Sequence, residues 1–110
     1  MSVRTAQVIS RSGLEPVYTA ADVAGDEFVN TGREFFHIKN GDGSPHTMTI
    51  ETPNTVDTLA IADRDVVIPA GEERMIGPFA GGTYNDSAGS VQVTYDAVTS
   101  VTLALVRPGT

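Results

Sequence analysis

The feature that most constrains the fold is a series of short segments in which apolar and polar residues alternate. The 110-residue chain contains 13 Val, 6 Ile and 13 Thr, whose β-branched side chains fit a pleated strand better than a helix. Alternation with a period of two places one face of a strand on a core and the other in water. The clearest runs are Phe36/Ile38, Met48/Ile50, Leu59/Ile61, Val91/Val93/Tyr95 and Val101/Leu103/Leu105.

Four weaker segments bring the expected total to about eight or nine short strands. They are residues 5–9, 26–30, 64–69 and 73–77. Between the strands, phrases such as "NGDGSP", "PAGEE" and "AGGTYND" supply the Gly, Asn and Asp that tight turns need. Only residues 18–26 have helical character, and Gly25 limits them to one turn at most. The pattern predicts an all-β fold, an antiparallel β-sandwich or jelly-roll-like domain with little or no helix.

The length indicates one domain, which we place at residues 21–110. Residues 1–20 have fewer large apolar side chains between their turn signals and form an N-terminal arm or edge strand in this interpretation. A segment of this kind can add to the sheet of a neighbouring subunit, and deleting residues 1–15 should then leave the domain folded.

The charge balance excludes some classes of partner. The chain carries 14 acidic and 7 basic residues, a net charge of −7, so neither nucleic acid nor an anionic membrane surface is expected as a partner. The absence of cysteine rules out disulfides and thiolate metal sites. We find no apolar segment long enough for a secretory signal or a membrane span and expect a soluble protein without an export signal of its own.

The stretch "FFHIKNGDGSPHTMTIE" at residues 35–51 is the strongest candidate for a chemical site, because it holds both histidines and an aspartate in or beside one loop. Four of its positions match a calcium-binding EF-hand loop, but Pro45 stands where that loop needs glycine and strands flank it. If Lys39 pairs with Thr47 in a hairpin, His37 and His46 do not converge, so no zinc site is expected.

The preferred interpretation of this stretch is a hairpin whose histidines face solvent. The connection from Asn40 to His46 is long by hairpin standards, so Asp42 and His46 are candidates for a surface contact.

Nucleophilic catalysis lacks support because the chain has no cysteine and no serine in a G-x-S-x-G turn. Asp63 and Asp65 form an exposed pair beside an arginine. We therefore assign no catalytic, cofactor-binding or metal-binding residue and expect a protein that is not an enzyme.

Four phrases in sequence carry a family resemblance. In order and spacing, "EFFHIKNGDGSPHTMTIETP", "DVVIPAGEERMIGPF", "TYND" and "VQVTYDAVTSVTLALV" resemble a family of small structural proteins of tailed bacteriophages, commonly regarded as capsid decoration (cement) proteins. The resemblance covers roughly residues 26–107 and departs from the family at "AGGTYND", where a proline-richer turn is typical. It implies a β-sandwich or jelly-roll-like domain without catalytic residues or cofactors.

The same resemblance implies a role on the virion. The protein would be made in the bacterial cytoplasm, bind the major capsid protein on the outer capsid surface and stabilise contacts between capsid subunits, with a homotrimer favoured by the symmetry of such a shell. An ordinary edge strand of the monomer is the alternative role for the arm. The predicted partner-contact residues are Val3, Arg4, Val8, Ile9, Leu14, Tyr18, Asp42 and His46.

Three other functions remain as alternatives. A tail, neck or head-fibre component would share the fold. A carbohydrate-binding sandwich would normally offer aromatic platforms, whereas this chain has no Trp and its Tyr18, Tyr84 and Tyr95 are spread along the sequence. A small metal-dependent enzyme is disfavoured by the presence of only two histidines.

Overall fold

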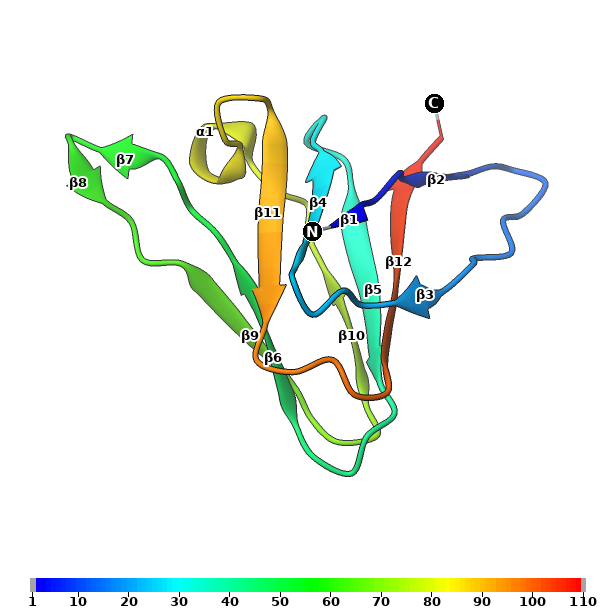
Figure 1. Ribbon diagram of the computed structural model, residues 1–110. Helices are drawn as coiled ribbons and strands as arrows, with labels where there is room; N and C mark the ends of the chain where they lie inside the picture. Colours follow the sequence, from blue (N-terminus) through cyan, green and yellow to red (C-terminus); the bar gives the residue numbers. More distant parts are fainter. Residues whose placement is uncertain (1, 110) are drawn as a thin grey trace.

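A computed structural model describes residues 2–109 and shows a mostly β architecture with one short helix (Figure 1). Eight strands have three residues or more: β2 (Gln7–Ile9), β4 (Asp26–Val29), β5 (Phe35–Asn40), β6 (His46–Ile50), β9 (Arg64–Ile68), β10 (Glu73–Ile76), β11 (Ser90–Tyr95) and β12 (Val101–Pro108). Four have two residues: β1 (Ser2–Val3), β3 (Thr19–Ala20), β7 (Thr55–Val56) and β8 (Leu59–Ala60). The predicted all-β class is therefore confirmed, and these twelve strands exceed the predicted eight or nine.

The strands form two larger sheets and a separate two-stranded hairpin. Sheet A has the order β1-β4-β11-β6-β9, and sheet B has the order β10-β5-β12-β2, with β3 also paired to β12. Strands β7 and β8 pair only with each other. Both larger sheets are mixed, because β1 runs parallel to β4 and β2 runs parallel to β12, whereas their other pairings are antiparallel. The prediction of a purely antiparallel fold was thus wrong for the strands that the N-terminal segment contributes.

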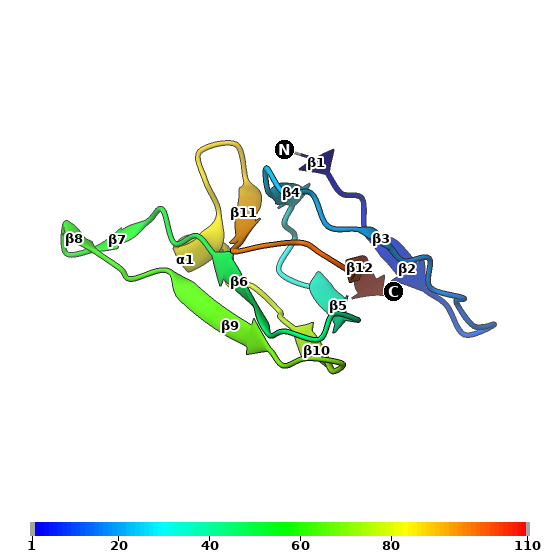
Figure 2. The same ribbon diagram turned by 60° about the horizontal axis from the view of Figure 1, so that its bottom comes forward.

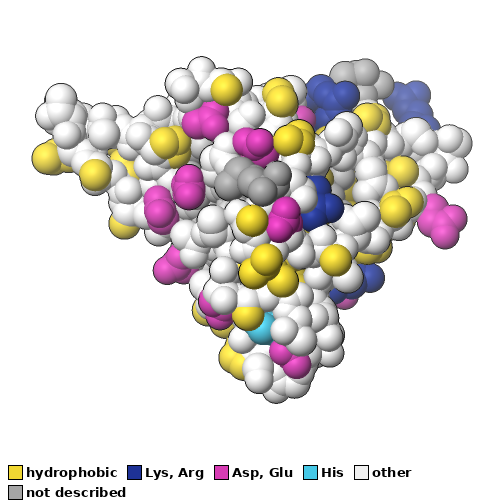
Figure 3. All heavy atoms as spheres, viewed as in Figure 1, with side chains coloured by type: hydrophobic (Ala, Val, Ile, Leu, Met, Phe, Trp, Pro, Cys, Tyr) yellow, Lys and Arg dark blue, Asp and Glu magenta, His cyan; other side chains and the backbone are white. Residues whose placement is uncertain are grey.

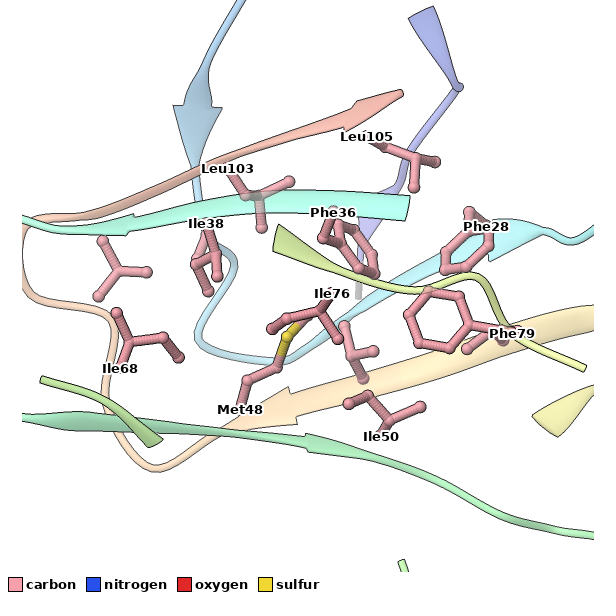
Figure 4. Packing of buried hydrophobic residues seen from close by; sticks show 14 residues of the cluster. Phe28, Phe36, Ile38, Met48, Ile50, Ile68, Ile76, Phe79, Leu103 and Leu105 are labelled. Atoms are coloured by element: carbon pink, nitrogen blue, oxygen red, sulfur yellow. The ribbon is translucent and has the colours of Figure 1, made fainter. Parts of the chain in front are cut away.

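The core lies between the inward faces of sheets A and B (Figure 4). Strand β5 alternates strictly, with Phe36 and Ile38 buried and their neighbours half-buried, and β6 does the same with Met48 and Ile50. Phe28, Phe36 and Phe79 pack against one another with ring centroids 5.2 to 6.1 Å apart, at the edge-to-face and tilted angles that aromatic rings favour. The predicted core residues of β11 and β12, Val91, Val93, Val101, Leu103 and Leu105, are all buried.

The expected hairpin across residues 35–51 does not form. Strand β5 pairs with β10 and β12 in sheet B, whereas β6 pairs with β9 and β11 in sheet A. Lys39 therefore lies opposite Glu73 and Thr102, and not opposite Thr47. Residues 41–45 instead carry the chain from one sheet to the other. The alternation of both strands correctly indicated their buried faces but held no information about their neighbours.

Two further expectations concern local structure. Residues 18–26, expected to form one helical turn at most, contain no helix, because Thr19 and Ala20 pair with β12 and the following turn ends at Gly25 with φ of 100°. The helix lies instead at α1 (Gly81–Tyr84), which has four residues. Leu59 and Ile61 were expected to face the core, but Leu59 is exposed because the ribbon formed by β6 and β9 continues past the end of sheet A into the β7–β8 hairpin.

The molecule is flat, with principal extents of 40 × 36 × 20 Å. The β7–β8 hairpin projects at one end, and the loop of residues 10–18 between β2 and β3 projects at the opposite end, in both views (Figures 1 and 2). The two projections belong to segments that are far apart in sequence. Each copy of the protein therefore presents two separated surfaces.

Candidate protein-binding surface

The predicted contact residues of the N-terminal segment lie in a strap, residues 2–20, that crosses from the edge of sheet A to the edge of sheet B. Its β1 continues sheet A beyond β4, and its β2 and β3 pair with β12 in sheet B. Val3 and Val8 are exposed, and Ile9 is 38% exposed. We call the exposed Val3 and Val8 the exposed strip of the strap. Ile9 directly follows Val8 in β2, so its side chain lies on the opposite face of the strand and lines the groove described below.

Arg4 does not belong to the exposed strip, because it fastens the strap to the body of the protein. Its Nε donates to Asp26 Oδ1 at 2.7 Å, and its two terminal nitrogens donate to Thr19 Oγ1 and the Ala20 carbonyl at 2.6 Å each. Asp26 is fully buried and also accepts a hydrogen bond of 2.7 Å from the Tyr95 hydroxyl. Burial, and then the adjoining carboxylate, raise the pKa of Tyr95 above its ordinary value.

Tyr18 is half-buried on the outer face of sheet B. A hydrogen bond of 2.6 Å joins its hydroxyl to His37 Nδ1, and the Lys39 ammonium lies 4.0 Å from the centre of its ring. The other nitrogen of His37 donates to Glu73 Oε1 at 3.0 Å, since a carboxylate only accepts. Tyr18 is thus held in place as one wall of a groove, with its ring edge toward His37.

The groove lies between the loop of residues 10–18 and the outer face of sheet B. It has a volume of about 260 Å³, and we call it the arm groove. Met75 on β10 is exposed and forms the wall opposite the loop. Val106 lies directly across from Phe35 in the register of β12 and β5, so both lie on this face. The residues that define the arm groove are Ile9, Leu14, Tyr18, Phe35, Met75 and Val106.

A second hollow of about 350 Å³ adjoins the arm groove and shares Phe35 and Met75 with it. We call it the proline hollow, because Pro78 and Pro108 also line it, with Arg33 beside them. Gly77 at its base has φ of 137°, and a Cβ atom there would lie 2.7 Å from the Cβ of Phe35. Only glycine permits this close approach of the chain after β10 to β5.

The two predicted contact residues of the other loop are separate from these grooves. His46 was expected to face solvent but is only 7% exposed, because it begins β6 between two carboxylates. Its Nε2 lies 2.9 Å from Asp42 Oδ2, and its Nδ1 lies 3.5 Å from Asp96 Oδ1. The hydrogen bond from His46, then that from the Gly43 amide, lower the pKa of Asp42. This cluster ties the loop of residues 41–45 to the β11–β12 connection.

Asp96 also holds the start of β6. Its Oδ1 accepts hydrogen bonds from the Thr47 and Ala97 amides at 2.9 and 2.7 Å. Burial works to raise its pKa, but these amides and His46 together lower it below the ordinary value. The structure thus brings Asp42 and His46 together, as part of a cluster that stabilises the chain between sheets.

The exposed apolar pair at the tip of the β7–β8 hairpin was not predicted from the sequence. Val56 and Leu59 pair with each other and are 65% and 70% exposed. Asp57 and Thr58 between them have φ of 55° and 63°, as in the two-residue turns that suit a hairpin. The spacing of "TVDTLA" as two β-type pairs around two residues was a usable signal, but Asp-Thr is not the usual Asn-Gly or Asp-Gly.

Met75 was also missed. In "ERMIG" the apolar Met75 and Ile76 are consecutive, so a strand can bury only one of them. Ile76 is the buried one, and that choice leaves Met75 on the outer face. The sequence alone could not decide between them.

The described chain shows neither a metal centre nor a membrane-spanning helix. Within residues 2–109, no cluster of three or more His, Asp or Glu residues is arranged to hold a metal ion. The one helix in this range is four residues long, and none meets the length and apolar character of a membrane span.

Comparisons of the chain with models of protein families, with curated proteins and with solved structures find no match.

Proposed function

We propose that this protein is a non-enzymatic structural protein of a tailed-phage virion, of the capsid decoration type. It binds the major capsid protein on the outer surface of the capsid and stabilises contacts between capsid subunits. The proposal starts from the phage-like phrases in residues 26–107. The observation that carries it is the arm groove, a mainly apolar hollow between the strap and sheet B, together with the exposed Val3 and Val8 of the strap, because an apolar groove on the surface of a domain marks an interaction site.

The topology supports a jelly roll as the finer description of the fold. Without the parallel strands β1 and β2 and the β7–β8 hairpin, eight strands remain, and all their pairings are antiparallel. They divide into β4-β11-β6-β9 and β10-β5-β12-β3, two sheets of four. A double sheet of eight strands is the jelly-roll arrangement found in many viral capsid proteins. In this proposal residues 21–110 form the domain with β3, at the end of the preceding segment, as its eighth strand, and β1 and β2 are additions to its edges.

The strap is the surface we assign to the capsid. Val3 and Val8 extend outward while Arg4 between them is anchored to Asp26, so the apolar side chains are presented from a fixed backbone. Presenting a rigid apolar strip lowers the entropy cost of binding. Each contact can be weak, because many copies on one shell, and several contacts per oligomer, raise the effective affinity.

The acidic surface fits an outward position on the virion. The net charge of −7 limits adhesion to nucleic acid and to other particles. The homotrimer remains part of the proposal, since a threefold site on a shell would hold three copies equally. A tail, neck or head-fibre location is the alternative that the same fold and surface would serve.

Co-sedimentation with capsids of the parent phage, stripped of this protein, tests the proposal. The wild type should saturate at a fixed ratio to the major capsid protein. Val3→Asp and Val8→Asp should each reduce binding at least tenfold, because each places a charge in an apolar contact. Val67→Asp, at an exposed valine on β9, is the matched control and should bind normally.

Failure of the wild type to bind, or binding of only a few copies per particle, would overturn the capsid-surface assignment. A few copies per particle would indicate a unique vertex or the tail. Normal binding by both strap variants would show that another surface contacts the shell.

A further inference from the structure

We propose that copies of this protein associate head to tail, with the β7–β8 hairpin of one copy inserted into the proline hollow of the next. The inference rests on the proposed function only for the expectation of a homo-oligomer. The two surfaces lie at different parts of each copy, so the interface is heterologous and closes into a ring or continues as a filament. A closed ring of three is the form that a threefold capsid site would accept.

The hairpin is the first reason for this proposal. All six residues from Thr55 to Ala60 are exposed, and the two strands contact only each other as a sheet. An isolated two-stranded hairpin is at best marginally stable in water, so a projecting one gains stability from a surface that covers it. Its Val56 and Leu59 point outward as a pair of anchors, 65% and 70% exposed.

The hairpin turn is the second reason. Thr58 adopts φ of 63°, a conformation that β-branched residues rarely tolerate, directly after Asp57 at 55°. A two-residue hairpin turn requires positive φ at both central residues, and with a β-branched residue there the turn stores backbone strain. Here it holds the two strands in the register that brings Val56 and Leu59 side by side at the tip.

The proline hollow has the size and lining to receive this tip. Its volume is about 350 Å³, enough for the seven side-chain carbons of Val56 and Leu59. Its lining is mainly apolar, from Phe35, Met75 and the two prolines. Met75 is 67% exposed, so a large apolar side chain is left uncovered within each single copy.

The charges of the hairpin and the hollow are opposite, which favours the hairpin of a second copy as the occupant of the hollow. The hairpin carries Asp57 at its tip, whereas Arg33 lines the hollow. In the described chain, the Arg33 side chain has neither an ion pair nor a hydrogen bond. On the face seen in Figure 3, most acidic side chains lie toward the hairpin side and basic ones toward the other. Head-to-tail contact brings these opposite charges together.

A protein partner other than a second copy would need its own apolar acidic projection. The chain already supplies one to itself, and every copy holds both halves of the contact. The hairpin of one copy does not reach its own hollow, because it projects away from sheet B in both views (Figures 1 and 2).

Sedimentation of the purified full chain in the absence of capsids tests the proposal. The wild type should show a concentration-dependent mass that approaches three times the 11.6 kDa of one chain. Leu59→Asp in the hairpin and Met75→Asp in the hollow should each be monomeric. Val23→Asp, at an exposed valine outside both surfaces, is the matched control and should associate as the wild type does.

Mixing the two monomeric variants gives the sharpest result. Leu59→Asp retains an intact hollow and Met75→Asp retains an intact hairpin, so a mixture should form a heterodimer and nothing larger. A symmetric contact, hairpin against hairpin or hollow against hollow, cannot be restored by this mixing. No heterodimer in the mixture would therefore overturn the head-to-tail contact.

A charge exchange tests the electrostatic part. Asp57→Arg and Arg33→Asp should each weaken association at least fivefold, and the double variant should recover most of the loss.

A wild type that stays monomeric up to about 1 mM would overturn the proposal, since any useful contact is tighter than that. Wild-type capsid binding without self-association would sink this inference alone. Self-association without capsid binding would sink the proposed function alone. Normal self-association by Leu59→Asp, with loss of capsid binding, would make the hairpin a capsid contact instead.

Discussion

The N-terminal strap, apart from β3 at its end, and the β7–β8 hairpin lie outside the eight antiparallel strands, but they are held in opposite ways. The strap is fixed by parallel pairing at the edges of both sheets and by the hydrogen bond from Arg4 to Asp26. Within the strap, Arg4 also donates to Thr19 and Ala20, and the Gln7 amide exchanges two hydrogen bonds of 2.8 Å with the Val17 backbone. In the hairpin, no side chain from Thr55 to Ala60 makes a hydrogen bond or ion pair within the described chain. The comparison separates an element that the monomer stabilises from one whose stability depends on another surface.

The largest effect in this comparison should come from the strap. Replacing Arg4 with Met leaves Asp26 fully buried without its cationic partner, and breaking a buried ion pair in this way costs about 3 kcal/mol. The free energy of unfolding, measured in urea, should fall by that amount. Arg11→Met, at an exposed arginine of the same segment, should change it by less than about 0.5 kcal/mol.

If Arg4→Met lowered the free energy of unfolding as little as Arg11→Met, the strap would be no better held than the hairpin.

The contact between Arg4 and Asp26 also changes the design of a truncation experiment. Deleting residues 1–15 removes Arg4 as well as the exposed strip, so loss of capsid binding would be mixed with loss of stability. Point variants of Val3 and Val8 separate the two effects.

A smaller loss is expected when the other partner of Asp26 is removed. Tyr95→Phe deletes a hydroxyl that donates to the buried carboxylate at 2.7 Å, and a hydrogen bond to a charged group is worth about 1.5 kcal/mol or more. Tyr84→Phe is a matched control, because its hydroxyl accepts from Arg64 at 3.0 Å at an exposed position. Equal effects of the two changes on urea unfolding would mean that the Asp26 cluster does not fasten the strap.

Lowering the pH should also weaken the hydrogen bond that joins the strap to Asp22. The pKa of Asp22 is lowered, first by the hydrogen bond from the Ser2 hydroxyl of the strap and then by the Ala24 amide. A carboxyl whose folded pKa lies below its unfolded value, near 4, stabilises the fold above that value. This contribution is lost as the pH falls through the lower folded pKa. The pKa values of three other carboxyl groups are lowered as well, so these groups also stabilise the fold at higher pH. They are Asp42, Asp86 and Asp96.

The free energy of unfolding of the wild type should therefore decrease between about pH 5 and pH 2. Asp22→Asn removes one titrating group, so its stability should depend less steeply on pH in this range. Identical pH profiles for the two proteins would show that the Ser2 contact is not maintained in solution.

The sequence predicted those parts of the structure that depend on alternation along one strand. Phe36 and Ile38, like Met48 and Ile50, were expected in the core and are almost completely buried. Their period of two identifies a face without reference to any other strand. The all-β class follows from the number of such segments and from the turns between them.

Pairing between strands was beyond the same reasoning. Strands β5 and β6 follow each other in sequence but belong to different sheets, because residues 41–45 cross from sheet B to sheet A in a largely exposed loop. That crossing is also what buries His46 between Asp42 and Asp96, two carboxylates from different parts of the chain. A contact between Arg4 and Asp26 likewise has no local signature, since 22 residues separate the two.

Exposure at the candidate surfaces was only partly predictable. The strap was identified from its weak apolar content, and Val3, Val8 and Ile9 are indeed exposed. Leu59 carried a strand-like pattern that pointed to the core, and its alternation is real. The ribbon that contains it extends past the end of sheet A, so neither of its faces has a core to contact.

The smallest effect on the stability of the monomer should come from the hairpin. Leu59→Ser removes an apolar side chain that is 70% exposed and touches no buried cluster, so the free energy of unfolding at a concentration where the protein is monomeric should change by less than about 0.5 kcal/mol. At higher concentrations the wild type should gain stability through association, and the variant should not. The measurement is the urea midpoint of both proteins across a range of concentrations. Parallel behaviour at every concentration would place the hairpin with the strap, as an element that the single chain stabilises by itself.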